Sequence, residues 1–321
     1  MGCFFVLTNK TKLDDSICLL TNHQHIFACP ICSQSMMVQS RSLVCGNHHS
    51  FDIAKQGYVN LLSRAHTTKY DKQLFTARSA ISADGFFEPM LEGVHAAIKR
   101  AIRSTVGGVK ILDAGCGEGS HLSEILFRLN EHSNDKHFGV GIDIAKAGIS
   151  LASRKGARDS GTSRTLKGYG EYGTLDTIWC VADLAKCPFA DQSFDVIVNV
   201  MSPAKYTEFQ RLLADEGLII KVVPESHYLK QLRGEFYSQT DKDVYSNEQT
   251  VELFRHHFEL LDIQRVQYEA TLNKDQLQQL IQMTPLSWGA PEETLRKMTD
   301  LHQSEVTFDY SILIGSKKER E

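Results

Sequence analysis

Three cysteines and a histidine pair near the N-terminus have the spacing of a metal site. Cys29 and Cys32 form a Cys-x2-Cys pair, and Cys45 follows thirteen residues later, with His48 and His49 close behind. Two thiolates on one tight turn bind one side of a tetrahedral ion, so a second turn must supply the other two ligands. Mixed sulfur and nitrogen ligands favour zinc, and four protein ligands leave no open position for chemistry. We therefore predict a structural zinc ion, bound by the three cysteines and one of the two histidines.

Disulfide and redox roles account for these cysteines less well than a metal site does. The chain has eight cysteines, and the remaining five are scattered without the regular spacing of a disulfide framework: Cys3, Cys18, Cys116, Cys180 and Cys187. A thioredoxin-like redox role for Cys29 and Cys32 would require strand and helix signals around them, and the sequence has none there. Two buried thiols beside an unrelated histidine pair would not explain the ribbon-like spacing of the second pair of ligands.

A glycine-rich segment in the middle of the chain has the pattern of a cofactor turn. A predicted buried strand at 109–113 ends in Asp113, continues through Gly115, Gly117 and Gly119, and enters a predicted helix at 120–129. This order is typical of Rossmann-like folds, in which glycines allow the backbone to touch the ligand. The spacing differs from the phosphate-directed Gly-x-Gly-x-x-Gly, which favours S-adenosylmethionine, a cofactor without a pyrophosphate, over a dinucleotide.

Acidic residues end the next two predicted strands. Asp143 follows the strand at 137–142, where its carboxylate can accept hydrogen bonds from both ribose hydroxyls of a cofactor. Asp183 follows the strand at 177–182 and is placed to bond an adenine amino group. Asp195 is better explained as a turn residue. Just past the fourth strand, where a methyl acceptor would sit, weak candidates for substrate contact are Asn199, Ser202 and Tyr206.

The alternation of strands and helices predicts an α/β fold with a doubly wound, Rossmann-like class I methyltransferase sheet and a small N-terminal zinc-binding module. Strands at 260–270 and 305–315 would close the sheet, and the segment at 156–175 is an unusually long loop. The predicted division is an N-terminal extension (1–26), a zinc-binding module for RNA recognition (27–62), a linker with helices (63–104) and the methyltransferase domain (105–321).

Composition and charge restrict the class of protein. The apolar share of 42% and charged share of 23% are those of a globular protein. No run of residues is long and apolar enough for a membrane span, and the N-terminus lacks the basic region of a signal peptide, which predicts a cytoplasmic protein. The net charge of −4 hides an asymmetry, because residues 1–105 hold 11 Lys and Arg against 7 Asp and Glu. A basic N-terminal part is compatible with a polyanionic partner.

Taken together, the motifs resemble one family, the bacterial 23S ribosomal RNA (guanine-N1)-methyltransferases of the RlmA type. The resemblance extends from about residue 27 to the C-terminus. It rests on five segments: Cys29-Pro-Ile-Cys32, the segment from Cys45 to His49, the run from Phe51 through Lys-Gln-Gly-Tyr-Val-Asn-Leu to Leu62, the turn at 112–119, and Gln282-Met-Thr-Pro-Leu-Ser-Trp288. A zinc knuckle followed by Lys-x-Gly-Tyr-Val-Asn-Leu-Leu is not shared by generic methyltransferases.

The resemblance implies a set of site residues. Zinc would be bound by Cys29, Cys32, Cys45 and His49, since the family spacing Cys-x3-His selects the second histidine. Cofactor contacts are implied for Phe87, Gly117, Glu118 and His227. The family pattern can have tyrosine where this chain has Phe87, so the ring is retained and the hydroxyl is lost.

The resemblance also implies an activity: transfer of the methyl group of S-adenosylmethionine to N1 of a guanine in a hairpin loop of 23S ribosomal RNA, with the zinc module as the RNA clamp. Two alternatives remain open, a methyltransferase for a small molecule and a non-catalytic RNA-binding protein with a methyltransferase-like fold. The intact set of Asp113, Gly115, Gly117 and Asp143 argues against the second alternative. The sequence leaves the oligomeric state open, a homodimer included.

Overall fold

The structure is a computed structural model that describes residues 11–64, 66–102, 107–131, 133, 135–155, 176–237 and 245–318. The long loop predicted at 156–175 lies outside the described residues. Within them, no helix is long and apolar enough to cross a membrane.

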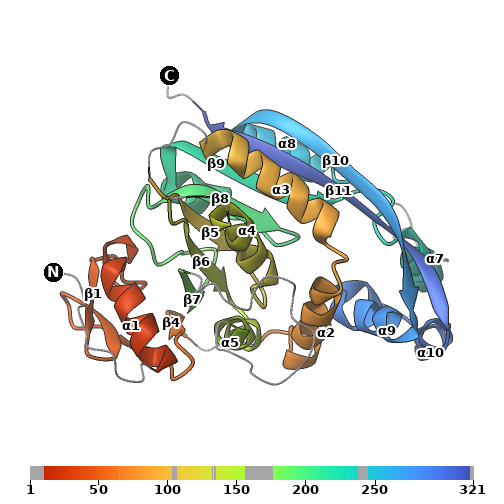
Figure 1. The fold of residues 1–321 in the computed structure, drawn as a ribbon, viewed down its shortest axis with the longest axis horizontal. Helices are drawn as coiled ribbons and strands as arrows, with labels where there is room; N and C mark the ends of the chain where they lie inside the picture. Colours follow the sequence, from red (N-terminus) through yellow and green to blue (C-terminus); the bar gives the residue numbers. More distant parts are fainter. Residues whose placement is uncertain are drawn as a thin grey trace.

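An eight-stranded sheet forms the centre of the molecule (Figure 1). In their order across the sheet, the strands are β10 (Phe258–Asn273), β11 (Gln303–Lys317), β9 (Leu213–Pro224), β8 (Phe194–Val200), β5 (Lys110–Ala114), β6 (Phe138–Asp143), β7 (Thr177–Val181) and β4 (Val59–Asn60). Strands β4 to β9 run parallel to one another, whereas β11 is antiparallel to both β9 and β10. The predicted doubly wound class I methyltransferase sheet is thus confirmed, with an antiparallel pair closing one side.

Alternate residues of the central strands enter two separate cores, one on each face of the sheet. Ile111 of β5 packs in the first core with residues of α3 (Glu88–Ala101), α4 (Ser120–Asn130) and α5 (Lys146–Lys155). Its neighbour Leu112 packs in the second core with α6 (Tyr206–Leu212) and α8 (Glu248–His257). This division follows from the two-residue period of a strand, which sends successive side chains to opposite faces.

The zinc-ligand module is docked on the edge of this sheet. Its antiparallel strands β1 (Met36–Gln39), β2 (Ser42–Cys45) and β3 (Ser50–Asp52) form a small sheet of their own. Strand β4 then pairs with β7 and extends the large sheet by one strand. The rings of Phe27 and Phe189 are fully buried with centroids 5.5 Å apart. The module and the methyltransferase sheet therefore share one hydrophobic core.

Part of the predicted N-terminal extension is helical. Helix α1 (Lys12–Asn22) begins with a capping box between Thr11 and Asp14, and it buries Leu20 in the core shared by the zinc-ligand module and the sheet. In Figure 1 this helix lies against the module beside β4. The segment thus helps to join the two parts.

The opposite side of the molecule is built from helices that flank the closing strands. Helix α2 (Lys72–Ala83) packs against α9 (Lys274–Met283). The chain then passes through the 3-10 helix η4 (Pro285–Gly289) and α10 (Glu292–Thr299) before it enters β11. Helix α7 (Lys230–Tyr237) packs against β11 and η4. Figure 1 shows α2 between α5 and α9.

Candidate cofactor and metal sites

The four predicted zinc ligands meet in one cluster. The ligand atoms of Cys29, Cys32, Cys45 and His49 all lie within 4.8 Å of one another. His49 Nδ1 lies 3.5 Å from Cys29 Sγ and 3.4 Å from Cys45 Sγ, and Cys32 Sγ lies 3.6 Å from Cys45 Sγ. His48 is exposed and adopts a positive φ of 61°, and its backbone N–H donates to the Cys45 carbonyl. The structure therefore selects His49 as the fourth member of the cluster.

The cluster has the size of a tetrahedral zinc site. With Zn–S near 2.3 Å and Zn–N near 2.0–2.1 Å, a tetrahedron has edges of about 3.8 Å between sulfurs and about 3.6 Å between sulfur and nitrogen. Three of the six separations, at 3.4–3.6 Å, lie close to these edges, and the other three are no longer than 4.8 Å. A hydrogen bond from the Gln34 backbone lowers the pKa of Cys32 to about 6, which favours the thiolate that binds metal. The four side chains fit a structural zinc ion.

The glycine-rich turn requires glycine at each of its three glycine positions. Gly115, Gly117 and Gly119 all have positive φ, between 57° and 88°. A Cβ at Gly115 would lie 1.9 Å from Ser202 Oγ, and one at Gly119 would lie 2.5 Å from the Trp179 ring. Any other residue at these two positions would be strained and would also clash. The glycines therefore allow the backbone of the turn to pack closely between β5 and α4, at the carboxyl ends of the strands.

Asp143 holds this turn in place. Its two carboxylate oxygens accept the backbone N–H groups of Gly117 and Ala145, at 2.9 and 2.8 Å. Burial raises the pKa of Asp143 above its ordinary value, while these two amides oppose the rise. Each carboxylate oxygen can accept a further hydrogen bond, so the residue can bind ribose hydroxyls while it orders the turn.

Asp113 lies under the turn with one oxygen unsatisfied. The residue is 2% exposed, and its Oδ1 atom has no hydrogen-bond partner among the described residues. Burial raises its pKa to about 7; the charge of Arg78 opposes this rise, and the charges of Asp143 and Glu118 add to it. A buried carboxylate with a free oxygen is costly unless a cation or a donor completes it. The turn therefore offers a place for a positively charged ligand group.

Arg78 was not among the sequence-predicted site residues, yet α2 brings it to the turn. A Cβ at Gly117 would lie 3.4 Å from Arg78 Nη1 and 3.1 Å from the Phe75 ring. The guanidinium contacts His121 Nδ1 at 3.3 Å, and its Nε atom is buried without a hydrogen-bond partner in the described part of the chain. No described carboxylate lies within ion-pair distance of it. The only signal in the sequence was a basic residue on a predicted helix before the turn.

Two of the acceptor-side candidates are buried and already engaged. Asn199 is fully buried, its amide donates to the carbonyls of Ala114 and Pro203, and its oxygen accepts from Lys221 Nζ. Tyr206 is 5% exposed and packs edge-on against Phe209, Phe254 and Phe258, because helix α6 faces the second core. Neither side chain is available to a substrate in this arrangement.

Ser202 is the acceptor-side candidate that reaches the turn. Its hydroxyl lies over Gly115, and its carbonyl accepts from Lys221 Nζ at 3.1 Å. Burial lowers the pKa of Lys221 to about 8. Lys221 and Asn199 are paired across β8 and β9 and together hold the loop after β8. We assign them a positioning role for this loop.

The remaining candidates lie at the rim or behind the turn. Asp183 is exposed, and its carboxylate accepts the Ala185 N–H at 2.8 Å. Glu118 is buried and accepts the Ser120 hydroxyl. Its contact to the cofactor and that of Asp183 stay predictions.

Phe87 and His227 differ in exposure. Phe87 is 4% exposed and packs edge-on against His121, whose ring is also in contact with Arg78. His227 follows β9 and is half exposed, with Nδ1 3.6 Å from the buried Asp309 carboxylate, which also accepts the His227 backbone N–H. Phe87 therefore packs behind His121 and Arg78. Direct contacts of Phe87 and His227 with the cofactor stay predictions.

Comparison with known proteins agrees with both parts of the chain. Residues 27–67 match the family model of the RlmA N-terminal zinc ribbon, and residues 106–284 match a methyltransferase domain model. The chain is 37% identical over 298 residues to a Bacillus subtilis protein provisionally named 23S rRNA (guanine-N(1)-)-methyltransferase, a match that covers 91% of this chain and 97% of the relative. This chain belongs to the RlmA-type methyltransferase family.

Two further relatives differ in how much of this chain they match. The 23S rRNA (guanine(748)-N(1))-methyltransferase of Streptomyces fradiae is 28% identical over 85% of this chain and 90% of its own length. A phthiotriol/phenolphthiotriol dimycocerosates methyltransferase of Mycobacterium tuberculosis is also 28% identical, but over only 42% of each chain. Similarity along nearly the whole length thus occurs with the RNA-directed relatives.

The turn of this RlmA-type enzyme fits its cofactor, S-adenosylmethionine. The amino-acid end of that molecule has an ammonium and a carboxylate. The free Asp113 oxygen suits the ammonium, and the unpaired Arg78 Nε suits the carboxylate. Asp143, one strand further, suits the ribose. These three side chains would orient the cofactor along the carboxyl ends of β5 and β6.

We predict that Arg78→Ala weakens S-adenosylmethionine binding by about 10- to 100-fold, the range for a hydrogen bond to a charged group. Arg78→Lys should recover part of the affinity, because lysine keeps the charge but not the planar donor pair. Calorimetry would measure both, with Arg100→Ala on α3 as a control for an exposed arginine.

Methylthioadenosine, which lacks the amino-acid end, provides the internal test. Its affinity should be the same for wild type and Arg78→Ala. An equal loss of affinity for both ligands would mean that Arg78 only supports the turn.

Proposed function

We propose that this enzyme transfers the methyl group of S-adenosylmethionine to N1 of a guanine in a hairpin loop of 23S ribosomal RNA. The supporting observation is the 37% identity along 91% of the chain to an RNA-directed relative, with the zinc ribbon and the methyltransferase domain both matched. The proposal is also supported by the presence of Asp113, Asp143 and three glycines with positive φ in one turn. A non-catalytic RNA-binding protein would have no need of this set.

The sulfonium of the bound cofactor supplies the methyl group, and the protein supplies orientation and shielding from water. Ser202 and the loop held by Asn199 and Lys221 border the turn on the side where the acceptor would enter. N1 of neutral guanine has a proton that must leave during the transfer. Because N1 lies on the Watson–Crick edge, the guanine must be unpaired or flipped out of a helix, and a hairpin loop meets this condition.

The zinc ribbon supports an RNA substrate rather than a small molecule. Its exposed charged residues are mainly basic, with Arg41, Lys55 and Arg64 against Asp52. Phosphate contacts from such residues provide most of the affinity in RNA and DNA complexes. The phthiotriol/phenolphthiotriol dimycocerosates methyltransferase, which is not named for an RNA substrate, matches only 42% of this chain. A small-molecule acceptor would leave the docked basic module without a purpose in the reaction.

The product gives the direct test of this proposal. Methylation at N1 prevents Watson–Crick pairing, so reverse transcriptase should stop one nucleotide before the modified guanine in ribosomal RNA from wild-type cells. We expect the stop to vanish when the gene is deleted and to return with the intact gene. Asp143→Ala should not restore it.

Nucleoside mass spectrometry separates the possible products. N1-methylguanosine should decrease in the large-subunit RNA of the deletion strain and be restored by the intact gene. Unchanged N1-methylguanosine in that strain would refute the proposed substrate and leave the methyltransferase assignment intact.

A further inference from the structure

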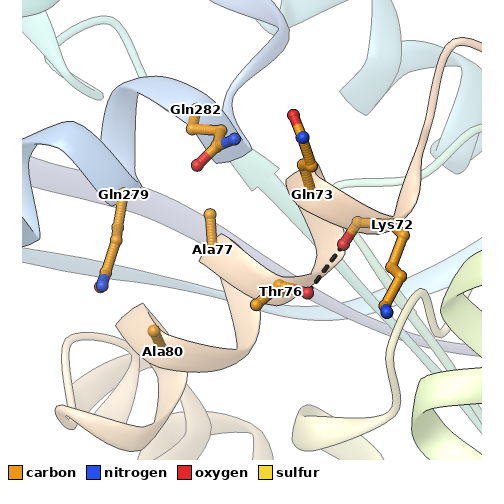
Figure 2. A pocket seen from close by; sticks show the side chains of 7 residues that line it. All are labelled: Lys72, Gln73, Thr76, Ala77, Ala80, Gln279 and Gln282. Carbon is orange, nitrogen blue, oxygen red and sulfur yellow. Dashed lines mark hydrogen bonds between the residues drawn. The ribbon is translucent and has the colours of Figure 1, made fainter.

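A groove runs between α2 and α9, outside the cofactor site. It encloses about 550 Å³ and is lined by Lys72, Gln73, Thr76, Ala77 and Ala80 from α2 and by Gln279 and Gln282 from α9 (Figure 2). The surface of the groove is mainly apolar, and the two alanines contribute to it. A volume of this size is that of a small-ligand site.

The polar side chains of the groove are available to a ligand. Within the part of the chain that the structure describes, the amides of Gln73, Gln279 and Gln282 form no hydrogen bonds, and Lys72 Nζ has no ion pair. The Thr76 hydroxyl donates to the Lys72 carbonyl, which leaves its oxygen free to accept (Figure 2). An amide has donors and an acceptor side by side, which is the pattern that the edge of a nucleobase requires.

An exposed aromatic pair lies beyond one end of the groove. The two helices are antiparallel, since Gln276 near the start of α9 bonds to Asp84 after the end of α2. Gln282 therefore lies at the end where Tyr70 precedes α2 and Trp288 follows α9. The rings of Tyr70 and Trp288 meet edge-on at 5.2 Å, and they are 41% and 45% exposed.

The aromatic pair is associated with positive charge. Lys69 Nζ lies 5.7 Å from the centre of the Trp288 ring. Lys72 lines the groove itself, so two lysines lie within two residues of Tyr70 in the chain. The Asp71 carboxylate between them accepts the Leu74 N–H at the start of α2. Exposed aromatic rings with adjacent cations form the usual surface for single-stranded nucleic acid, in which bases stack and phosphates meet lysines.

Helix α2 lies between the groove and the cofactor turn. One side of α2 directs Phe75 and Arg78 at Gly117 of the cofactor turn, and another side lines the groove with Lys72, Gln73 and Thr76. The groove is therefore separated from the cofactor by about one helix diameter, roughly 10 Å. That separation suits a nucleotide beside the target guanine rather than the guanine itself.

We propose that the groove between α2 and α9, with the Tyr70–Trp288 pair at its end, binds an unpaired nucleotide that neighbours the methylated guanine. This inference rests on the proposed RNA substrate. The aromatic pair stacks on the base or its neighbour, the glutamine amides contact its edge, and Lys69 and Lys72 contact the backbone phosphates. Substrate RNA is thus held on both sides of the cofactor, by the zinc ribbon and by this groove.

The test uses the full-length enzyme and hairpin RNA transcribed from the large-subunit gene. Trp288→Ala should weaken RNA binding and raise the KM for RNA by about tenfold or more, the size of one lost stacking contact. Trp288→Phe should recover much of this, whereas affinity for S-adenosylmethionine and the melting temperature should stay unchanged in both variants. Leu253→Ala, at an exposed apolar residue on α8, is the matched control and should behave like wild type.

Photo-crosslinking locates the contact directly. Hairpin RNA with 5-iodouridine beside the target guanine should crosslink to the peptide that contains Tyr70 or Trp288. Crosslinks confined to residues 27–62, or an unchanged KM for RNA in Trp288→Ala of an enzyme that does methylate the hairpin, would overturn this inference alone. A wild-type enzyme that does not methylate ribosomal RNA would instead refute the proposed function, and this inference with it.

Discussion

Replacing Cys29 and Cys45 together by serine is expected to remove the zinc ion and lower the melting temperature of the whole enzyme by about 10 °C or more. Structural zinc in small modules is worth about 10–16 kcal/mol of apparent binding free energy, so these modules unfold without it. In this protein, unfolding of the zinc module would also destabilise the methyltransferase sheet. Phe27 is buried against Phe189, and β4 is hydrogen-bonded to β7 of the large sheet. A loss of about 7 kcal/mol, which is less than the binding free energy of such a zinc ion, corresponds to roughly 10 °C in a protein of this size.

Metal analysis and thermal melting would check this expectation together. Wild type should contain one zinc per chain, and the double variant should contain none. His48→Ala is the matched control, because His48 is exposed beside the cluster and should be dispensable for zinc. Full zinc content in the double variant would exclude this site, and loss of zinc in His48→Ala would show that the wrong histidine had been assigned.

The same variant separates the two parts of the enzyme. At a temperature where the double variant is still folded, its methylation of RNA should be lost, while S-adenosylmethionine still binds. This follows because Asp113, Asp143 and the glycine turn lie on strands that do not pair with those of the zinc ribbon. Loss of cofactor binding at that temperature would mean that the module supports the cofactor site itself.

The parallel part of the fold could be predicted from sequence because its signals are local. Each buried strand of the central sheet is a short apolar run, and Gly115, Gly117 and Gly119 mark the turn by residue type alone. The zinc ligands were equally clear, because Cys29, Cys32, Cys45 and His49 have a characteristic spacing. In such cases the residues that make the feature lie close together in the chain.

Features that depend on distant contacts were not predictable. Strand β4 is only two residues long, Val59–Asn60, and its partner Cys180–Val181 lies about 120 residues away. Its pairing shows that the zinc ribbon contributes one strand to the large sheet, whereas the sequence suggested a separate module. Asn199 gave the signal of a substrate contact, a polar residue at a strand end. The folded sheet places Asn199 opposite Lys221 on β9, where it is buried and accepts a hydrogen bond from Lys221 Nζ.

Arg78 shows the same limit at the cofactor site. Nothing near it in the sequence distinguishes it from the other basic residues at 63–84. It reaches Gly117 because α2 is held between α5 and α9, and this packing is a property of the folded chain. The site is therefore assembled from a turn that was predictable and a helix whose position was not.

For Asp143→Ala we expect a loss of S-adenosylmethionine affinity of about 100-fold, larger than for any other carboxylate near the turn. The carboxylate is placed to accept ribose hydroxyls, and hydrogen bonds to charged groups are worth about 1.5–3 kcal/mol each. The structure adds a second cost, because the same oxygens accept the N–H groups of Gly117 and Ala145. Removing them leaves two amides unsatisfied and frees the glycine turn. Asp143→Asn should be almost as weak, since its NH2 group would face one of these donors.

Asp195→Ala is the matched control for this experiment. Asp195 also has a carboxylate oxygen bonded to a backbone amide, that of Lys110 at 2.8 Å, but at the start of β5, away from the turn. Its loss should lower the melting temperature slightly and leave cofactor affinity at the wild-type value. Calorimetric titration of S-adenosylmethionine into the wild type and the three variants gives the comparison. If Asp143→Ala bound the cofactor as tightly as wild type, or if Asp195→Ala lost as much affinity, the assignment of the ribose to the end of β6 would be wrong, because both carboxylates accept backbone amides and only Asp143 lies at the carboxyl ends of the strands.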